Sequence, residues 1–150
     1  MTAVPDLAAA ERRVRESFAR QAFMATVGAQ VTAVRAGEVE IDLPFAPGNT
    51  QQHGFVHGGL VASIADSACG YAALTLMPAD AAVLSVEFKI NFLSPAKGER
   101  LRAIGRVVRA GRKLFVCAGD VLARQGGVEK PVALVTATMI VAETTSGLRD

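Results

Sequence analysis

The sequence predicts one α+β domain in which an antiparallel β-sheet is wrapped around a single long central helix. Two observations support this prediction. Apolar and polar residues alternate with a period of two in most of the chain, and residues 60–77 form an apolar segment with one formally charged residue, Asp66. A chain of 150 residues can bury one full core, and no repeat or composition break marks a second domain. We therefore expect a single domain over residues 1–150, with frayed ends at 1–5 and 144–150.

The segment before the sheet is expected to be one amphipathic helix. Asp6 is a residue type that caps helices, and apolar residues follow at helical spacing from Leu7 to Phe18. At Gly28 the helical period ends and a period of two begins. The helix should therefore lie on the surface and end near Gly28.

Six segments are expected to be strands because they alternate in polarity or are rich in β-branched residues. They lie around 30–33 and at 38–43, 81–93, 100–109, 113–122 and 131–143. Short turns that contain Gly37, Gly111 and Gly126 separate three pairs of these segments, which favours antiparallel hairpins. In segment 81–93, strict alternation places Leu84, Val86, Phe88, Ile90 and Phe92 on one face, and Ser85, Glu87, Lys89 and Asn91 on the other.

The central helix should be buried on one side by this sheet and should carry one polar stripe. Ser63, Asp66, Ser67 and Gly70 follow the i, i+3, i+4, i+7 spacing of a helix face. Because a single sheet covers only one side, we expect the other side to meet a second subunit through small residues. These are Ala65, Ala68, Cys69, Ala72 and Ala73.

Composition and charge argue against several classes of protein. A formal net charge of +2, from 16 basic and 14 acidic residues, is too balanced for nucleic acid as the main partner. The polar stripe in the longest apolar segment and the lack of a secretory leader predict a cytoplasmic protein that does not enter a membrane. Cys69 and Cys117 lie in apolar runs without metal-ligand spacing, so we expect buried free thiols rather than a disulfide or a metal site.

The residues that lead into the central helix are of the type found in oxyanion sites. His57-Gly58-Gly59 lies where a loop becomes a helix, and the N–H groups of a first helical turn have no intrahelical partner. Glycine lets a carbonyl oxygen approach these N–H groups closely. Tight packing of the two glycines is the simpler alternative.

Asp66 follows Gly58 by eight residues, which corresponds to about 12 Å along a helix. The carbonyl carbon of one thioester or ester cannot contact both positions of the same chain. If both act on one substrate, they come from two subunits whose helices lie antiparallel and side by side. The alternative is a structural carboxylate that accepts hydrogen bonds from serines where two subunits meet.

These motifs resemble those of one known family. The run Gln51-x-x-Gly54-x-x-His57-Gly58-Gly59, the later Ala65-Asp66, and the segment Asn91-Phe92-Leu93-Ser94-Pro95-Ala96 are similar to motifs of the hotdog-fold acyl-CoA thioesterases of the PaaI type. The resemblance extends from Phe23 to Val141 and includes the order of helices and strands. It implies the hotdog fold and hydrolysis of an acyl-CoA to a free acid and coenzyme A, without a metal or an organic cofactor.

The resemblance also implies roles for individual residues. Asp66 takes the position of the nucleophile or general base, and the Gly58 amide takes that of the group that polarises the thioester carbonyl. Gln51 stands where the family commonly has an asparagine, which keeps the amide chemistry with a longer reach. His57 is expected to shape the loop. Ser85 matches a position that holds the attacking water in some members, and a solvent-facing serine is the simpler alternative.

The resemblance further implies a binding site for the coenzyme A part of the substrate. Its expected residues are Gly59, Phe92, Ser94, Lys97, Arg109, Gly111, Arg112 and Lys113. Four of these are cations, which suit the phosphates of the nucleotide. Three belong to a run of six cations from Arg100 to Lys113, for which a charged, solvated sheet edge is the alternative. A homodimer is the minimum for a shared site, and the resemblance suggests a homotetramer.

The sequence therefore favours an acyl-CoA thioesterase, with two alternatives. One is a hotdog hydroxyacyl-thioester dehydratase, which would pair a catalytic histidine with a carboxylate and would hydrate crotonyl-CoA. The other is a noncatalytic acyl-CoA-binding module, which would bind acyl-CoA tightly without releasing a thiol.

Overall fold

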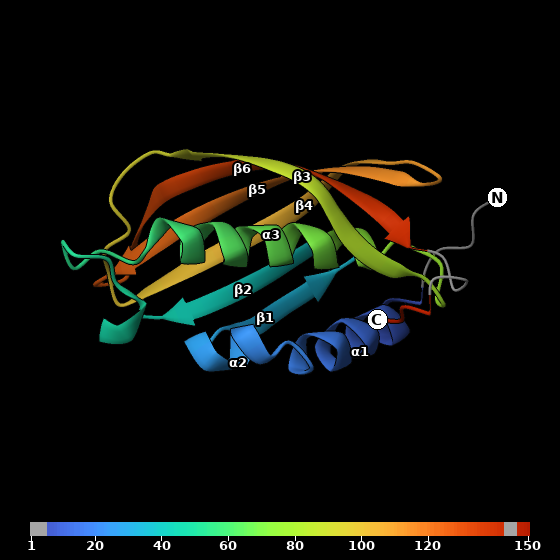
Figure 1. Ribbon diagram of the computed structural model, residues 1–150, viewed down its shortest axis with the longest axis horizontal. Helices are drawn as coiled ribbons and strands as arrows, with labels where there is room; N and C mark the ends of the chain where they lie inside the picture. The colour runs from blue at the N-terminus through green and yellow to red at the C-terminus, as the bar shows by residue number, and fades with distance from the viewer. Residues whose placement is uncertain (1–5, 143–146) are drawn as a thin grey trace.

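The computed structural model describes residues 6–142 and 147–150, and these form an antiparallel sheet that curves around one central helix (Figure 1). The strand order is β1-β2-β4-β5-β6-β3, and every neighbouring pair is antiparallel. The elements are α1 (Leu7–Ala19), α2 (Ala22–Val27), β1 (Gln30–Arg35), β2 (Glu38–Pro44), the 3-10 helix η1 (Pro47–Asn49), α3 (Gly58–Leu74), β3 (Ala82–Phe92), β4 (Arg100–Ala110), β5 (Leu114–Gln125) and β6 (Val128–Ala142). The predicted α+β class and hotdog architecture are confirmed.

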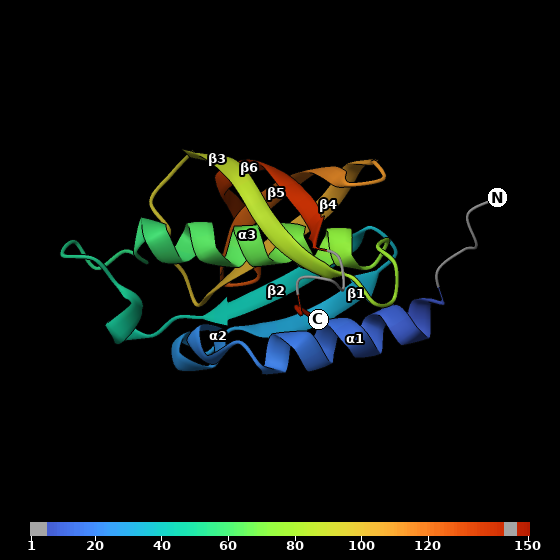
Figure 2. The same ribbon diagram turned by 45° about the vertical axis from the view of Figure 1, so that its right-hand side comes forward.

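The N-terminal segment forms two helices rather than the single helix that the sequence predicts (Figure 2). Asp6 caps α1 as expected, because its carboxylate accepts a hydrogen bond from the Ala8 N–H at 3.1 Å. The helix breaks at Gln21, whose backbone is extended and whose side chain donates to the Tyr71 hydroxyl of α3 at 2.7 Å. Gly28 then ends α2 in the left-handed region, at φ 81°.

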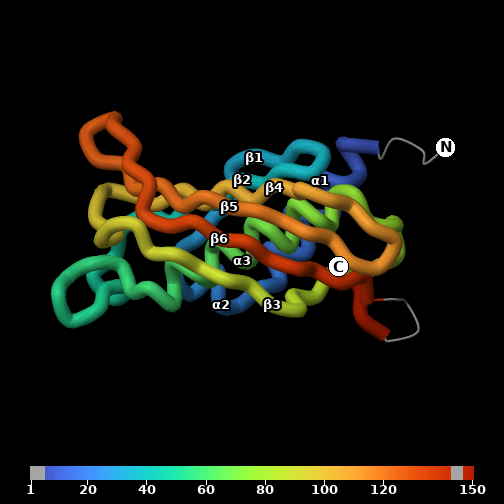
Figure 3. The backbone as a smooth tube through the Cα atoms, turned by 90° about the horizontal axis from the view of Figure 1, so that it is seen from above, coloured from blue at the N-terminus to red at the C-terminus, as the bar shows by residue number. Residues whose placement is uncertain are grey.

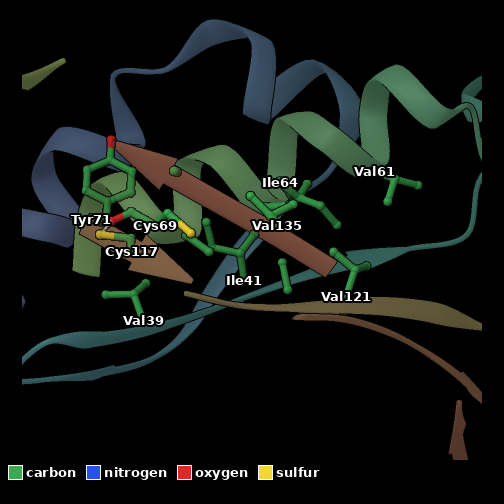
Figure 4. Close-up of a cluster of buried hydrophobic side chains, with 14 of the residues drawn as sticks. Val39, Ile41, Val61, Ile64, Cys69, Tyr71, Cys117, Val121 and Val135 are labelled. Atoms are coloured by element: carbon green, nitrogen blue, oxygen red, sulfur yellow. Dashed lines mark hydrogen bonds between the residues drawn. The ribbon is translucent and has the colours of Figure 1, made fainter. Parts of the chain in front are cut away.

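Two glycines form a trough in the sheet in which α3 lies. Gly105 of β4 and Gly119 of β5 are cross-strand partners on the inner face, between Val39 of β2 and Val135 of β6. A Cβ added to Gly105 would lie 2.3 Å from the Ala68 backbone, so no side chain fits there. Figure 4 shows the aliphatic side chains that close the core around this contact, with Ile41, Ile64 and Val135 between helix and sheet.

This close contact corrects one prediction about α3. The small residues Ala65, Ala68, Cys69, Ala72 and Ala73 are buried within the subunit and do not form its accessible side. They are small because the helix backbone approaches its own sheet closely. The half-buried side of α3 instead carries Ser63, Asp66 and Ser67, as the polar-stripe prediction requires.

Gly105→Ala should destabilise the fold by about 3 kcal/mol, because backbone atoms of α3 occupy the space of the new methyl group and cannot rotate away. Urea unfolding monitored by circular dichroism measures this loss. Gly48→Ala is a matched control, since a Cβ at Gly48 meets nothing within 4 Å. Equal stability of the two variants would contradict the close approach.

A β-bulge in β3 corrects the predicted face of Ser85. The pairing of β3 with β6 is continuous from Ala82 to Ser85 and resumes at Glu87, so Val86 is the extra residue. Ser85 opposes Met139, which is buried, whereas Glu87 opposes Thr138 on the outer face. The bulge thus places Ser85 on the face that carries Ile90 and Phe92, toward α3, and not among the solvent-facing residues.

Strand β3 lies at one edge of the sheet, beside β6 (Figure 3). Several large apolar side chains on this strand and directly after it are exposed in the single subunit. They are Leu84, Val86, Phe88, Phe92 and Leu93. An apolar edge strand of 11 residues is a surface on which a second chain can pair.

The cations of β4 do not lie at a sheet edge, which corrects that alternative. Strand β4 runs between β2 and β5, and three of its arginines pair with carboxylates of β2, β5 and β6 on the outer face. The ion pairs are Arg100–Asp42, Arg102–Glu40, Arg102–Glu129, Arg106–Glu38 and Arg106–Asp120, at 2.6–3.0 Å. These arginines are therefore neutralised within the subunit.

Both cysteines are buried free thiols, as predicted. Burial is the main cause that raises the pKa of Cys69 to about 12 and that of Cys117 to about 11, so neither is a thiolate nucleophile at neutral pH. No helix within residues 6–142 and 147–150 is long and apolar enough to cross a membrane.

The chain end differs from the frayed segment that the sequence predicts. Residues 1–5 and 143–146 lie outside the described part, but Asp150 is placed against α1 and β3. Its carboxylate accepts from the Val83 N–H at 2.6 Å and from the Ser17 hydroxyl at 2.9 Å. These two bonds hold the end of the chain beside α1 (Figure 1).

Candidate active site

Asp66 lies at the wall of a cavity on the accessible side of α3. Its carboxylate accepts a hydrogen bond from the Ser85 hydroxyl at 2.7 Å. Burial raises the pKa of the Asp66 carboxyl above its ordinary value, and the bond from Ser85 opposes this effect. A carboxylate that is partly desolvated, held by one hydroxyl and open to a cavity can accept a proton or attack an electrophile.

The cavity beside Asp66 has a volume of about 170 Å³. It extends along α3 toward the helix C-terminus and meets the break between α1 and α2. Its lining residues are Gln21, Asp66, Ser67, Gly70, Tyr71, Val83, Ser85 and Asp150. The cavity thus connects the Asp66–Ser85 pair to side chains from two other segments of the chain, the break between α1 and α2 and the segment at Asp150.

The N-terminus of α3 forms a second part of the site. His57 is the N-cap residue, and its Nδ1 accepts a hydrogen bond from the Gly59 N–H at 2.9 Å. The Gly58 N–H has no hydrogen-bond partner among the residues that the structure describes. It lines a pocket of about 390 Å³ with Phe55, Phe92 and other residues of the loop before α3 and the end of β3. A carbonyl oxygen in this pocket can accept from the Gly58 N–H.

Gln51 lies in the Gly58 pocket and not beside Asp66. Its amide oxygen accepts from the backbone N–H groups of His53 and Phe55, which organises the loop before α3. The amide NH₂ of Gln51 remains as the group that can donate to a ligand. Asn49, two residues earlier, donates to the Val27 carbonyl at 3.0 Å and so attaches the loop to α2.

The two parts of the site are separate within one chain. No lining residue is shared by the Asp66 cavity and the Gly58 pocket. The structure therefore brings Ser85 to Asp66 and brings Gln51 and His57 to Gly58. Both histidines of the chain lie in the loop before α3, so no histidine pairs with Asp66 in the same subunit.

The residues expected to bind coenzyme A also divide into two groups. Phe92 and Ser94 line the Gly58 pocket, Gly59 follows Gly58 in α3, and Lys97 lines an adjoining pocket of about 580 Å³. Gly111 and Arg112 instead line a groove at the C-terminal end of α3, with Lys113 in the same β4–β5 turn and Arg109 at the end of β4. In one subunit, the second group is thus at the opposite end of α3 from Gly58.

Sequence reasoning missed the far end of the Asp66 cavity. Tyr71, Gln21 and Asp150 line it, and the Tyr71 and Phe18 rings form a T-shaped contact with centroids 5.9 Å apart. Tyr71 is the only tyrosine of the chain and lies in an apolar helix, where its hydroxyl requires a partner. That requirement was the one available signal, since Gln21 and Asp150 carry no motif.

Ser85→Ala should shift the acid side of the pH–rate profile to higher pH. Ser85 donates to the ionised Asp66 carboxylate and so lowers its pKa, and the variant leaves the raising effect of burial unopposed. If Asp66 acts in its ionised form, as the resemblance implies, activity then appears only at higher pH. The profile of kcat/KM for thioester hydrolysis measures this shift. Ser63→Ala, which removes a hydroxyl that donates to the Gly59 carbonyl, should leave the profile in place. A profile of Ser85→Ala that matches the wild type would contradict the role of this bond.

Three kinds of comparison relate this geometry to known proteins. Residues 53–130 match the model of the thioesterase superfamily. The structure of a thioesterase family protein from Silicibacter pomeroyi is 48% identical, with a TM-score of 0.88 over 89% of this chain and 98% of that one. The PaaI protein of Escherichia coli, from the phenylacetic acid degradation operon, has a TM-score of 0.80 at 21% identity, over 89% of this chain and 94% of that one.

A protein of Saccharolobus solfataricus that is provisionally assigned to the esterases is 33% identical over 58% of this chain. The aligned part covers 61% of that relative, so the chain spans about three fifths of the curated protein that it matches. The family match includes the N-terminus of α3, Asp66, Ser85 and all of β3 and β4, but not Gln21, Gln51 or Asp150, which line the two cavities. On this match and on the fold that it shares with PaaI, the chain belongs to the thioesterase superfamily and has a PaaI-type hotdog fold.

Proposed function

We propose that the protein hydrolyses an acyl-CoA thioester to a free acid and coenzyme A, with Asp66 as nucleophile or general base. The observation that carries this proposal is the Asp66 carboxylate itself, which is half-buried, bonded to Ser85 at 2.7 Å and open to a cavity. Membership in the thioesterase superfamily supports the reaction class. The net reaction is the same for either role of Asp66. An oxygen from water becomes bonded to the acyl carbon, the C–S bond breaks, and a proton goes to the thiolate.

We further propose that each site uses Asp66 of one subunit and the Gly58 N–H of another. Within one chain these groups lie in separate cavities, and their eight-residue separation corresponds to about 12 Å of helix. Two α3 helices that lie antiparallel bring the N-terminus of one beside Asp66 of the other. The apolar edge strand β3 offers a surface for such pairing, and its Phe92 already lines the Gly58 pocket.

Coenzyme A would then lie in the Gly58 pocket and extend to the adjoining pocket that contains Lys97. The two pockets share Phe55 and Pro95, and the second adds Lys130, a cation that sequence reasoning did not select. Neither lysine forms an ion pair in the described part of the chain. In the antiparallel dimer, the β4–β5 turn of the partner subunit approaches the Gly58 end of α3. The cations near that turn and the lysines beside the Gly58 pocket can therefore both reach the phosphates of coenzyme A.

The outer face of the sheet is the proposed surface for a dimer of dimers. Leu84, Ile140 and Leu114 form a cross-strand row there, because Ile140 is the partner of both leucines. Leu84 and Leu114 are 48% and 49% exposed, which leaves this row uncovered in the single subunit.

Release of free thiol from acyl-CoA, detected with DTNB, tests the proposed activity directly. We expect turnover with a short-chain acyl-CoA and no addition of water to crotonyl-CoA. Hydration of crotonyl-CoA would support the dehydratase instead. Tight acyl-CoA binding without thiol release would support the noncatalytic binding module.

A further inference from the structure

We propose that the cavity beside Asp66 is the acyl site and that its end wall selects short acyl groups ending in a hydrogen-bond donor, such as a hydroxyl, over those ending in a carboxylate. This inference rests on the proposed thioesterase activity and names the class of acyl group. Four side chains that no catalytic role uses form the end wall, and we call it the Tyr71 wall. Its residues are Ser17, Gln21, Tyr71 and Asp150.

The position of the cavity relative to Asp66 identifies its occupant. A thioester carbon beside the Asp66 carboxylate has its sulfur directed to the coenzyme A pockets, so the acyl chain must take the remaining space. That space runs from Asp66 and Ser67 to Gly70 and Tyr71 along α3. The pockets around Gly58, Lys97 and Arg112 do not include Asp66 among their lining residues.

The volume limits the length of the acyl group. The cavity holds about 170 Å³, and an engineered cavity of about 150 Å³ in another protein accommodates one benzene molecule. An acyl group of about six heavy atoms therefore fills the cavity. A chain of twice that length would have to displace the Tyr71 wall.

The hydrogen bonds of the Tyr71 wall run in one direction. Gln21 Nε2 donates to the Tyr71 hydroxyl at 2.7 Å. Ser17 donates its only proton to Asp150 Oδ1 at 2.9 Å, so in the 3.2 Å contact with Ser17 it is Tyr71 that donates. The protons of both hydroxyls are thus used within the wall.

The unused capacity of the wall is mainly that of an acceptor. The Asp150 carboxylate oxygens each receive one bond in the structure, from Ser17 and from the Val83 N–H, and each can receive another. Tyr71 Oη retains one lone pair, and Gln21 Oε1 has both of its own. Apart from the second N–H of Gln21, a ligand group at this end of the cavity meets acceptors. A hydroxyl of the acyl group can donate to them.

The charges of the cavity disfavour an anionic acyl group. Two carboxylates, Asp66 and Asp150, line it, and no lining residue is a cation. Arg13 interacts electrostatically with Asp150 from outside the cavity. A carboxylate at the far end of the acyl chain would lie between two groups of its own charge and would lose its hydration.

Three acyl-CoA substrates of nearly equal length test the proposal, and they differ in the terminal group. They are hexanoyl-CoA, 5-hydroxypentanoyl-CoA and glutaryl-CoA, with dodecanoyl-CoA as the length control. We expect kcat/KM to be about tenfold higher for the hydroxyl than for the methyl terminus, and about a hundredfold lower for the carboxylate. Equal values for the three short substrates, preference for glutaryl-CoA, or efficient use of dodecanoyl-CoA would overturn the selectivity and leave the thioesterase activity standing. No cleavage of any substrate would overturn both.

Variants of the Tyr71 wall test whether its side chains cause the selectivity for the acyl group. Asp150→Asn should raise the glutaryl-to-hexanoyl ratio of kcat/KM about tenfold, because it removes one negative charge from the cavity. Glu16→Gln is its matched control, since it removes the charge of an exposed carboxylate of α1 that does not line the cavity and should leave the ratio unchanged. Tyr71→Phe should lower the hydroxyl-to-methyl ratio, and Gln21→Met, on the less buried helix break, provides the same test if Tyr71→Phe does not fold. Unchanged ratios in Asp150→Asn and Gln21→Met would contradict the assignment.

Discussion

Asp66→Asn should lower kcat for acyl-CoA hydrolysis by roughly 10²- to 10⁴-fold while the protein stays folded. The amide is nearly the same size and can still accept the hydrogen bond from Ser85, but it neither attacks a thioester nor accepts a proton from water. Thiol release measured with DTNB gives the loss in kcat, and circular dichroism reports the fold. Near-normal turnover would exclude Asp66 as the nucleophile or base.

The same variant should be more stable than the wild type at neutral pH. Burial raises the pKa of Asp66 in the folded state above that of the unfolded chain, so the folded state holds the proton more tightly. The protonated Asp66 carboxyl therefore contributes its full stability below the pKa that it has in the unfolded chain. This contribution is lost as the pH rises through the pKa that it has in the folded state. Asparagine carries no charge, so Asp66→Asn should have a higher Tm at pH 7 but not at low pH. Asp120→Asn, on the outer face, is the control for both measurements and should retain full turnover.

Subunits that carry Gly58→Pro should restore activity to subunits that carry Asp66→Asn. Proline at Gly58 removes the N–H, and this position is the first of α3, where proline is tolerated. His57, at φ −58° and ψ 132°, already has the conformation of a residue before proline. Gly58→Pro alone should lose roughly 10²- to 10³-fold in kcat, the effect of removing one oxyanion donor.

The activity of mixed dimers distinguishes a site shared between two subunits from a site within one chain. Each mixed dimer holds one site with an intact Gly58 and an intact Asp66, so an equal mixture of the two variants should recover about a quarter of wild-type activity if subunits exchange freely. Gly58→Ala is the matched control, because it adds a Cβ 3.0 Å from the Phe92 ring but keeps the N–H. No recovery on mixing, with exchange verified by mass spectrometry, would place both groups in one chain.

Much of this fold follows from periodicity alone. The order of α3 and the six strands along the chain, the helix start at Gly58 and the polar stripe of α3 were all predicted, because each depends on neighbouring residues and on the regular period of a helix or strand. The position of Asp66 on the accessible side of α3 follows from the same helical spacing.

The parts that sequence reasoning missed depend on contacts between distant segments. The helix breaks at Gln21 because this side chain donates to Tyr71, fifty residues later. The small residues of α3 face the sheet because Gly105 and Gly119 become neighbours only after β4 and β5 pair. Ser85 faces α3 because one extra residue enters β3 opposite β6, which alternation in a single strand cannot reveal.

The bulge at Val86 makes the pairing register of β3 with β6, rather than any side chain, decide whether Asp66 has a hydroxyl partner. On one side of Val86 the strand presents Ser85 to α3, and on the other it presents Ile90 and Phe92 to the same face. If the same residues of β3 paired with β6 without the bulge, strict alternation would turn Ser85 and Phe92 to opposite faces, so only one of these two sets would face α3. Pairing without the bulge would therefore separate the carboxylate from its hydroxyl, or the Gly58 pocket from its aromatic wall, while every proposed catalytic residue remained in the sequence.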